Sequence, residues 1–90
     1  LCLTDRMVFG TYMALSECGM RIPDDVSVMG IGNWDWTEHL VPPLTTIDLP
    51  YKLMGYEAAS QLVDYLENSK LIESRLLSPK IIERQSVRTI

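Results

Sequence analysis

The chain has 90 residues and a net charge of −4, with 47% apolar and 22% charged side chains, a composition typical of folded globular proteins rather than disordered ones. We expect neither a membrane-spanning helix, which needs roughly 18 consecutive apolar residues, nor a signal peptide, since no basic stretch leads into an apolar one at the start. The acidic charge argues against direct contact of these residues with nucleic acid, because a phosphate-binding surface gathers Lys and Arg.

The chain starts on Leu1 without an initiator Met, so we expect a fragment of a longer protein with room for one small core. Cys2 and Cys18 lack Cys-x-x-Cys spacing, and His39 is the only histidine. A closed zinc site takes four Cys or His ligands in short-spaced pairs. We therefore predict buried, reduced cysteines, no metal and no cofactor.

The first predicted helix covers residues 5–18. Thr4 suits the N-cap position, Asp5 the first turn, and Gly19 the position just after the helix. Apolar or small side chains recur near the 3.6-residue period at Met7, Val8, Thr11, Ala14, Leu15 and Cys18. This stripe predicts the buried face of the helix.

Two strands and a long loop follow. The run 26–31 is apolar and β-branched, as in a strand buried on both faces, and 44–48 is a second, shorter strand. Between them, 32–43 shows no periodicity and carries both tryptophans. A loop of that length is uncommon in a compact domain unless it has a function.

The rest of the chain predicts a second helix over 50–68 with Pro50 in its first turn, a polar turn over 69–74, and short strands at Leu76–Leu77 and Ile81–Ile82. The apolar stripe of this helix comprises Met54, Ala58, Leu62, Tyr65 and Leu66. Helices alternating with strands indicate an α/β fold, in which crossover connections join the strands of a sheet.

The sequence contains no catalytic template such as G-x-S-x-G, a P-loop or H-E-x-x-H. The only G-x-G, at Gly30 and Gly32, lacks a third glycine, and the paired carboxylates of Asp24 and Asp25 are typical of a solvated turn. We therefore predict no catalytic residues and no enzymatic activity.

Candidate ligand-binding residues follow the first predicted strand directly: Gly32, Asn33 and Trp34. In open parallel sheets ligands bind outside the carboxyl ends of the strands. Thr4 and Asp5, which open the first helix after an apolar strand end, point to the same edge. Trp34 and Trp36 could instead pack in a core or a subunit interface, an interpretation that suits Trp36 better.

Four motifs occur in order along the chain: TDRMVFG at 4–10, GMRIPDDVSVMGI at 19–31, PPLTTI at 42–47 and ERQS at 83–86. Together they resemble the C-terminal third of the effector-binding domain of the lactose-repressor (LacI/GalR) family of transcriptional regulators. The resemblance covers nearly the whole chain.

This resemblance implies a two-lobed, periplasmic-binding-protein-like α/β fold, with parallel sheets flanked by helices. Residues 1–46 and about 79–90 would belong to the C-terminal lobe, and about 51–78 to the N-terminal lobe. A cytoplasmic homodimer would bind a small sugar-like effector between its lobes. It would reach operator DNA only through a headpiece absent from this chain, and it would not contact membranes.

The resemblance also assigns two groups of residues outside the ligand site. The expected dimer interface comprises Phe9, Met13, Trp36 and Leu40, which are apolar enough for subunit contact. The expected hinge between the lobes comprises Thr46, Ile47 and Asp48.

The chain departs from the family where the effector is bound. The helix usually opens with Asn-Asp, and the strand usually ends in a hydrophobic residue followed by Asp, whereas here the pairs are Thr4-Asp5 and Gly32-Asn33. Loss of a carboxylate lowers the repulsion against an anionic ligand, so we predict an acidic effector, a sugar acid of the gluconate type or a sugar phosphate. Its cationic partner is expected outside this segment, since Arg6 is the only nearby candidate.

Two other interpretations stay open at this point. One is a periplasmic or transporter-linked sugar-binding protein of the same fold. The other is a fragment of an α/β enzyme whose catalytic residues lie elsewhere.

Overall fold

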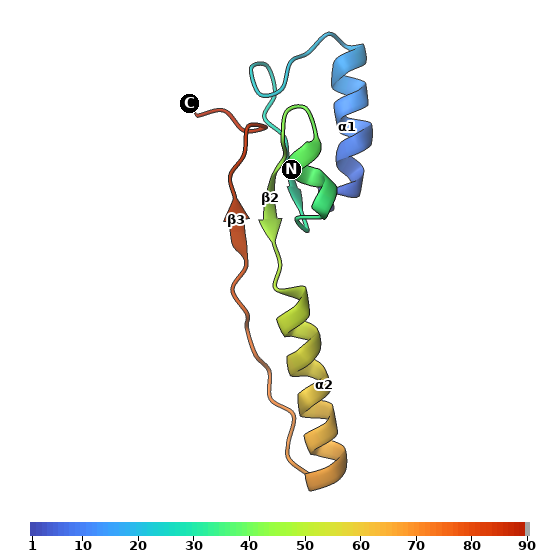
Figure 1. The fold of residues 1–90 in the computed structure, drawn as a ribbon, viewed down its shortest axis with the longest axis vertical. Helices are drawn as coiled ribbons and strands as arrows, with labels where there is room; N and C mark the ends of the chain where they lie inside the picture. Colours follow the sequence, from blue (N-terminus) through green and yellow to red (C-terminus); the bar gives the residue numbers. More distant parts are fainter. Residues whose placement is uncertain (90) are drawn as a thin grey trace. The chain divides into compact units, whose positions relative to one another are not determined.

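The computed structural model describes residues 1–89 of the chain. Its elements are, in order, α1 (Arg6–Glu17), β1 (Met29–Ile31), the 3-10 helix η1 (Asp35–His39), β2 (Thr45–Asp48), α2 (Tyr51–Asn68) and β3 (Lys80–Ile82). The chain forms two compact units (Figure 1). Unit 1 comprises residues 1–49 and 80–89, and unit 2 comprises Pro50–Pro79. The assignment of these units to two lobes stays a prediction.

The sheet of unit 1 has the strand order β1-β2-β3. β1 runs parallel to β2, with Met29 opposite Thr45, and β2 runs antiparallel to β3, with Thr46 opposite Ile82. The parallel pair and its flanking helix confirm the predicted α/β class. The strand predicted at Ile81–Ile82 is present as β3, but its antiparallel direction was not predicted, and it places the returning chain directly beside β2.

The first residues of the chain extend alongside β1. The Cys2 N–H donates to the Met29 carbonyl at 2.8 Å, and the Asp5 N–H donates to the Ile31 carbonyl at 3.0 Å. These bonds satisfy backbone groups on the free side of β1. They also set Asp5 beside the carboxyl end of that strand.

The core of unit 1 lies between α1 and the sheet. Its buried apolar members are Cys2, Val8, Val28 and Leu44, with Tyr12 and Leu15 among the partly buried side chains packed against them. The face of α1 that meets the core therefore runs through Val8, Tyr12 and Leu15. The predicted face was wrong in part, because Met7, Ala14 and Cys18 lie about 100° around the helix from this face and are exposed.

Both cysteines are free thiols. Burial was correctly predicted for Cys2 and wrongly for Cys18, which is exposed at the C-cap of α1. The helix ends as predicted, with Gly19 at a φ of 71°. The Met20 N–H donates to the Leu15 carbonyl at 2.9 Å, the bond of a Schellman motif.

The start of α1 differs from the prediction. The N-cap residue is Asp5 rather than Thr4, and its side chain makes no capping hydrogen bond. The Asp5 carboxylate is instead turned into the protein, toward β2 and the loop after β1. A tertiary contact has thus replaced the local one that the sequence suggested.

Unit 2 consists of α2 and an extended segment, 70–79, that runs back along it (Figure 1). The helix follows Pro50, which caps it instead of lying in its first turn, and ends at Ser69 in the left-handed conformation. All residues of the predicted apolar stripe are exposed, and α2 buries no residue. Neither α-helix of the described residues is long and apolar enough to cross a membrane.

The strand predicted at Leu76–Leu77 is absent, and 26–31 is regular only at Met29–Ile31. In place of a strand ladder, the returning segment is held by side chains of α2. The Glu73 N–H donates to Gln61 Oε1 at 2.9 Å, and Arg75 forms an ion pair with Glu57.

Candidate functional site

Asp5 is a wholly buried carboxylate that joins three segments of unit 1. Its Oδ1 accepts a hydrogen bond from the Thr46 hydroxyl at 2.7 Å, and its Oδ2 accepts one from the Trp34 N–H at 3.1 Å. The start of α1, the strand β2 and the loop after β1 are therefore fixed to one another. The carboxylate lies among the predicted site residues but is buried. Its direct contact with a ligand stays a prediction.

Two glycines make room for this carboxylate. A Cβ at Gly30 would collide with Asp5 Oδ1. Gly32 has a φ of 131°, and a Cβ there would lie 3.0 Å from ring atoms of Trp34 and 3.3 Å from Asp5 Oδ2. The conformation and the space both demand glycine at position 32, so this backbone excludes a side chain there.

Asn33 follows with a φ of 54°, a left-handed conformation that asparagine tolerates. Its N–H donates to the Thr46 hydroxyl oxygen at 3.3 Å. Its side-chain Oδ1 accepts a hydrogen bond from Arg84 Nη2 at 3.0 Å. The strand end is thus held from β2 on one side and from the C-terminal segment on the other.

Arg84 is the functional candidate that the sequence analysis missed. Its Nη1 donates to the Leu44 carbonyl at 2.8 Å and to the Thr37 hydroxyl oxygen at 2.9 Å, while Nη2 donates to Asn33. No carboxylate of residues 1–89 lies within 4.0 Å of this guanidinium. The expectation that only Arg6 could supply a nearby cation was wrong.

The sequence carries one signal for Arg84, its place in the ERQS motif. Nothing in the spacing shows that position 84 meets position 33, because the antiparallel pairing of β3 with β2 makes that neighbourhood. Arg6 lies exposed in the first turn of α1.

The structure brings Asp5, Gly32, Asn33 and Trp34 together at the carboxyl end of β1. Thr4 precedes Asp5 and is exposed. The Trp34 side chain is 54% exposed, so its indole is open to solvent in unit 1. An aromatic face and a half-buried amide beside a cation can bind a small polar molecule through stacking and hydrogen bonds.

The residues predicted for the dimer interface lie on two elements of unit 1. Phe9 of α1 and Trp36 of η1 stack with ring centroids 4.4 Å apart and an angle of 29° between the rings. Phe9 and Met13 are exposed, whereas Leu40 is half-buried and packs against the core. Their role in dimerisation stays a prediction.

The predicted hinge residues lie in β2. Thr46 is buried, and Ile47 and Asp48 pair with Ile81 and Lys80 of β3. The chain leaves unit 1 after Leu49, directly beyond this paired stretch. Their role as a hinge stays a prediction.

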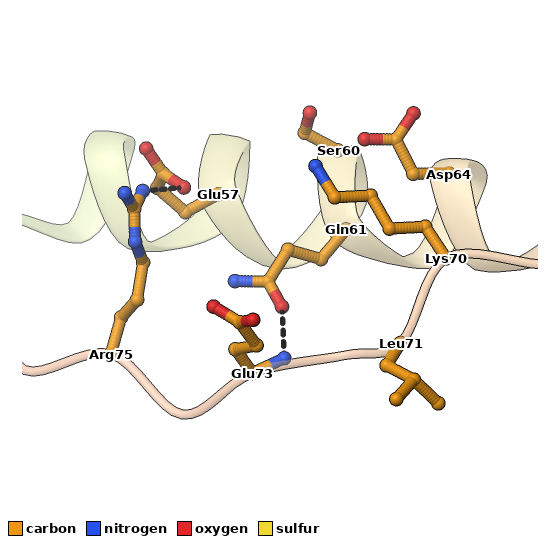
Figure 2. A pocket seen from close by; sticks show the side chains of 8 residues that line it. All are labelled: Glu57, Ser60, Gln61, Asp64, Lys70, Leu71, Glu73 and Arg75. Carbon is orange, nitrogen blue, oxygen red and sulfur yellow. Dashed lines mark hydrogen bonds and ion pairs between the residues drawn. The ribbon is translucent and has the colours of Figure 1, made fainter.

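Figure 2 shows a cavity of about 180 Å³ within unit 2, between α2 and the returning segment. Its lining is mostly polar and includes none of the predicted site residues: Glu57, Ser60, Gln61, Asp64, Lys70, Leu71, Glu73 and Arg75. Within residues 1–89, no group of three or more His, Cys, Asp or Glu side chains is arranged to hold a metal ion.

Residues 1–87 match the model of a family described as a periplasmic binding protein-like domain. The chain belongs to this family. The match spans both units and supports the two-lobed fold class inferred from the motifs.

Similar proteins place the chain in the LacI branch of this family. It is 37% identical over 91 residues to the HTH-type transcriptional repressor PurR of Vibrio atlanticus, covering 99% of the chain and 27% of that protein. A LacI family transcriptional regulator of Enterococcus faecalis with bound ribose is 38% identical, with a TM-score of 0.84 over 93% of the chain and 32% of the regulator.

The Lac repressor dimer bound to operator and an anti-inducer is 27% identical, with a TM-score of 0.86 over 94% of the chain and 30% of that protein. The chain spans about a quarter of the length of the curated relatives that it matches. It is therefore a segment of a LacI-type effector-binding domain, and the predicted family resemblance is confirmed.

Proposed function

We propose that the protein containing this chain is a cytoplasmic transcriptional regulator, in which the chain helps to bind a small sugar-like effector. The observation that carries the proposal is the set of contacts that holds Asn33 and Trp34 at the carboxyl end of β1. The ribose bound to the Enterococcus faecalis regulator supports the same class of ligand. Binding would shift the population between two domain arrangements and so alter operator affinity through a DNA-binding segment outside this chain.

We further propose that the effector carries an acidic group. Position 32 has no side chain, and the nearest carboxylate, Asp5, is buried with both oxygens bonded. The Arg84 guanidinium, without a carboxylate partner in the described residues, lies directly behind Asn33. A guanidinium without an ion-pair partner among residues 1–89, placed beside a binding edge, favours a carboxylate or phosphate group on the ligand. Asp35 and Glu38 of η1 are exposed and lie outside this set of contacts.

A thermal-shift panel on the intact protein tests both parts. Sugar acids such as D-gluconate, sugar phosphates and the matching neutral sugars are compared at equal concentration, and each is then added to the protein on its operator DNA. We expect an acidic sugar to raise the melting temperature and to change operator affinity. Stabilisation by neutral sugars alone would contradict the proposal of an acidic effector. No response to any sugar derivative would contradict the proposed ligand class.

We propose that two copies pair through the stack of Phe9, which is exposed, on the half-buried Trp36, together with Met13 of α1 and Leu40. The dimeric Lac repressor supports such pairing. Combining Phe9→Asp with Trp36→Ala puts a charge on the stack and removes its larger ring, so the intact protein should run at the mass of a monomer in light scattering. Val41→Asp, at a side chain that is 91% exposed, is the control and should leave the mass unchanged.

An exported sugar-binding protein is the alternative, because it shares the family's fold. The two functions differ in what lies upstream of Leu1. A helix-turn-helix supports the regulator, whereas a secretory signal supports the exported receptor.

A further inference from the structure

Asn33 has an amide whose orientation is dictated by its neighbour. A guanidinium carries only donors, so the group that faces Arg84 Nη2 at 3.0 Å must be the carbonyl oxygen Oδ1. The Thr37 hydroxyl, 3.5 Å from the same oxygen, makes its shorter bond of 2.7 Å to the Trp34 carbonyl. Asn33 therefore keeps its oxygen inside and turns Nδ2, which can only donate, away from Arg84.

Arg84 is itself held too firmly to release this amide. Besides the bonds from Nη1 to Leu44 and Thr37, its backbone N–H donates to the Thr45 hydroxyl oxygen at 2.9 Å. Ser86, two residues on, is buried; its hydroxyl donates to the carbonyl of Val28, just before β1, and accepts from the N–H of Thr45 in β2. Arg84 is thus held at both its backbone and its guanidinium. Because the guanidinium is planar, fixing Nη1 also fixes the direction in which Nη2 donates to Asn33.

We propose that Arg84 is a positioning residue that sets effector selectivity through Asn33. With Oδ1 engaged, Asn33 offers a ligand two N–H donors and no acceptor, so it favours groups that only accept, such as a carboxylate or phosphate, over hydroxyl groups that must also donate. A family member with a carboxylate at the strand end offers acceptors instead and suits hydroxyl groups that donate. The inference rests on the proposed binding site and adds the residue that determines which chemical group is accepted there.

The first test measures binding of D-gluconate and D-glucose to the intact protein by calorimetry. Asn33→Asp keeps the size of the side chain and its pairing with Arg84 but replaces the outward donor with an acceptor. We expect the preference for gluconate over glucose to fall at least tenfold. Arg84→Met frees the amide and should bring the preference close to one, whereas Arg84→Lys, which keeps the positive charge on one donor nitrogen, should restore part of it.

Arg88→Met is the matched control, because Arg88 lies in the same terminal segment and, within residues 1–89, its guanidinium donates only to the Asp24 carbonyl, at 3.1 Å, on the exposed surface. It should keep the wild-type preference. A merely structural role for Arg84 would weaken both sugars by the same factor and leave their ratio unchanged, which would overturn the inference.

A second measurement is independent of the ligand. The order parameter of the Asn33 side-chain amide, from nitrogen relaxation, should be that of a rigid group in the wild type and should fall in Arg84→Met. If it is the same in both proteins, Arg84 does not position Asn33. If neither sugar binds the wild type, the proposal of a gluconate-type effector fails, and the relaxation result still decides the role of Arg84.

Discussion

The two units of this chain differ in how far their own buried contacts determine their geometry. In unit 1 the buried residues include more polar members than apolar ones: Asp5, Thr37, Thr45, Thr46 and Ser86 against Cys2, Val8, Val28 and Leu44. Every buried side-chain N or O atom of the described residues has a hydrogen-bond partner. In unit 2, α2 buries nothing.

Unit 1 is ordered by buried hydrogen bonds, whereas unit 2 is ordered by exposed side-chain contacts along one helix. A buried polar group without a partner costs about 1–3 kcal/mol, so a fully bonded set specifies one arrangement of the segments that carry it. An 18-residue helix without tertiary packing is only marginally stable in water, and the ion pair and amide contact along α2 add little. Unit 1 can therefore position a binding edge with precision, whereas unit 2 carries an uncovered apolar stripe.

Asp5→Ala should have the largest effect on this comparison. It leaves the Thr46 hydroxyl and the Trp34 N–H without their shared acceptor, so we expect a loss of about 2–5 kcal/mol in unfolding free energy. Urea unfolding of the intact protein measures it. Asp24→Ala, at an exposed carboxylate of the same unit, should change stability by less than about 0.5 kcal/mol. Equal effects of the two variants would show that the buried contacts are not decisive.

A pair of glycine substitutions compares the two units directly. Gly30→Ala forces a methyl group against Asp5 and should cost about 1–3 kcal/mol. Gly55→Ala, in α2, meets no atom within 4 Å and should stabilise by about 0.5–1 kcal/mol through helix propensity. Thermal unfolding of both variants checks the signs. Destabilisation by Gly55→Ala would show that this face of α2 is tightly covered in the intact protein.

Tyr12→Phe tests a half-buried hydroxyl of unit 1. The hydroxyl donates to the Pro42 carbonyl at 2.8 Å, and its loss should cost about 0.5–1.5 kcal/mol at neutral pH. Burial raises the pKa of Tyr12 above its usual value of 10.0, so the folded state favours the neutral form. Stability should therefore decline as the pH rises above about 10, where unfolded tyrosine ionises.

The Tyr12→Phe variant should lose that part of the alkaline decline, as measured by urea unfolding between pH 9 and pH 11 (about one unit either side of the tyrosine pKa). Tyr56→Phe, whose ring is 69% exposed on α2, is the matched control and should leave the profile unchanged. An identical decline in wild type and Tyr12→Phe would contradict the assignment.

The smallest effect is expected in unit 2. Arg75 is 58% exposed in its ion pair with Glu57, so a double-mutant cycle with Glu57→Ala and Arg75→Ala should give a coupling of about 0.2–1 kcal/mol that falls with added salt. A coupling above about 2 kcal/mol would mean that the pair is desolvated in the intact protein.

The order and type of the main elements could be predicted from the sequence. Both helices, the glycine that ends α1, the strands β1 and β2 and the α/β class follow from periodicity, β-branched runs and turn residues, which act over a few neighbouring positions. The prediction of a strand at Leu76–Leu77 was wrong, because two adjacent apolar residues do not reveal whether another strand lies beside them. Side chains of α2 hold that segment instead.

The site divides in the same way. The sequence alone placed Asp5, Gly32, Asn33 and Trp34 near one strand end, since the ends of buried strands and the starts of helices are visible in the pattern. Only the tertiary structure turned Asp5 inward, required glycine at position 32 and brought Arg84 to Asn33. Those features depend on which strand lies beside which, and hydrogen bonds between residues 51 positions apart leave no periodic trace in the chain.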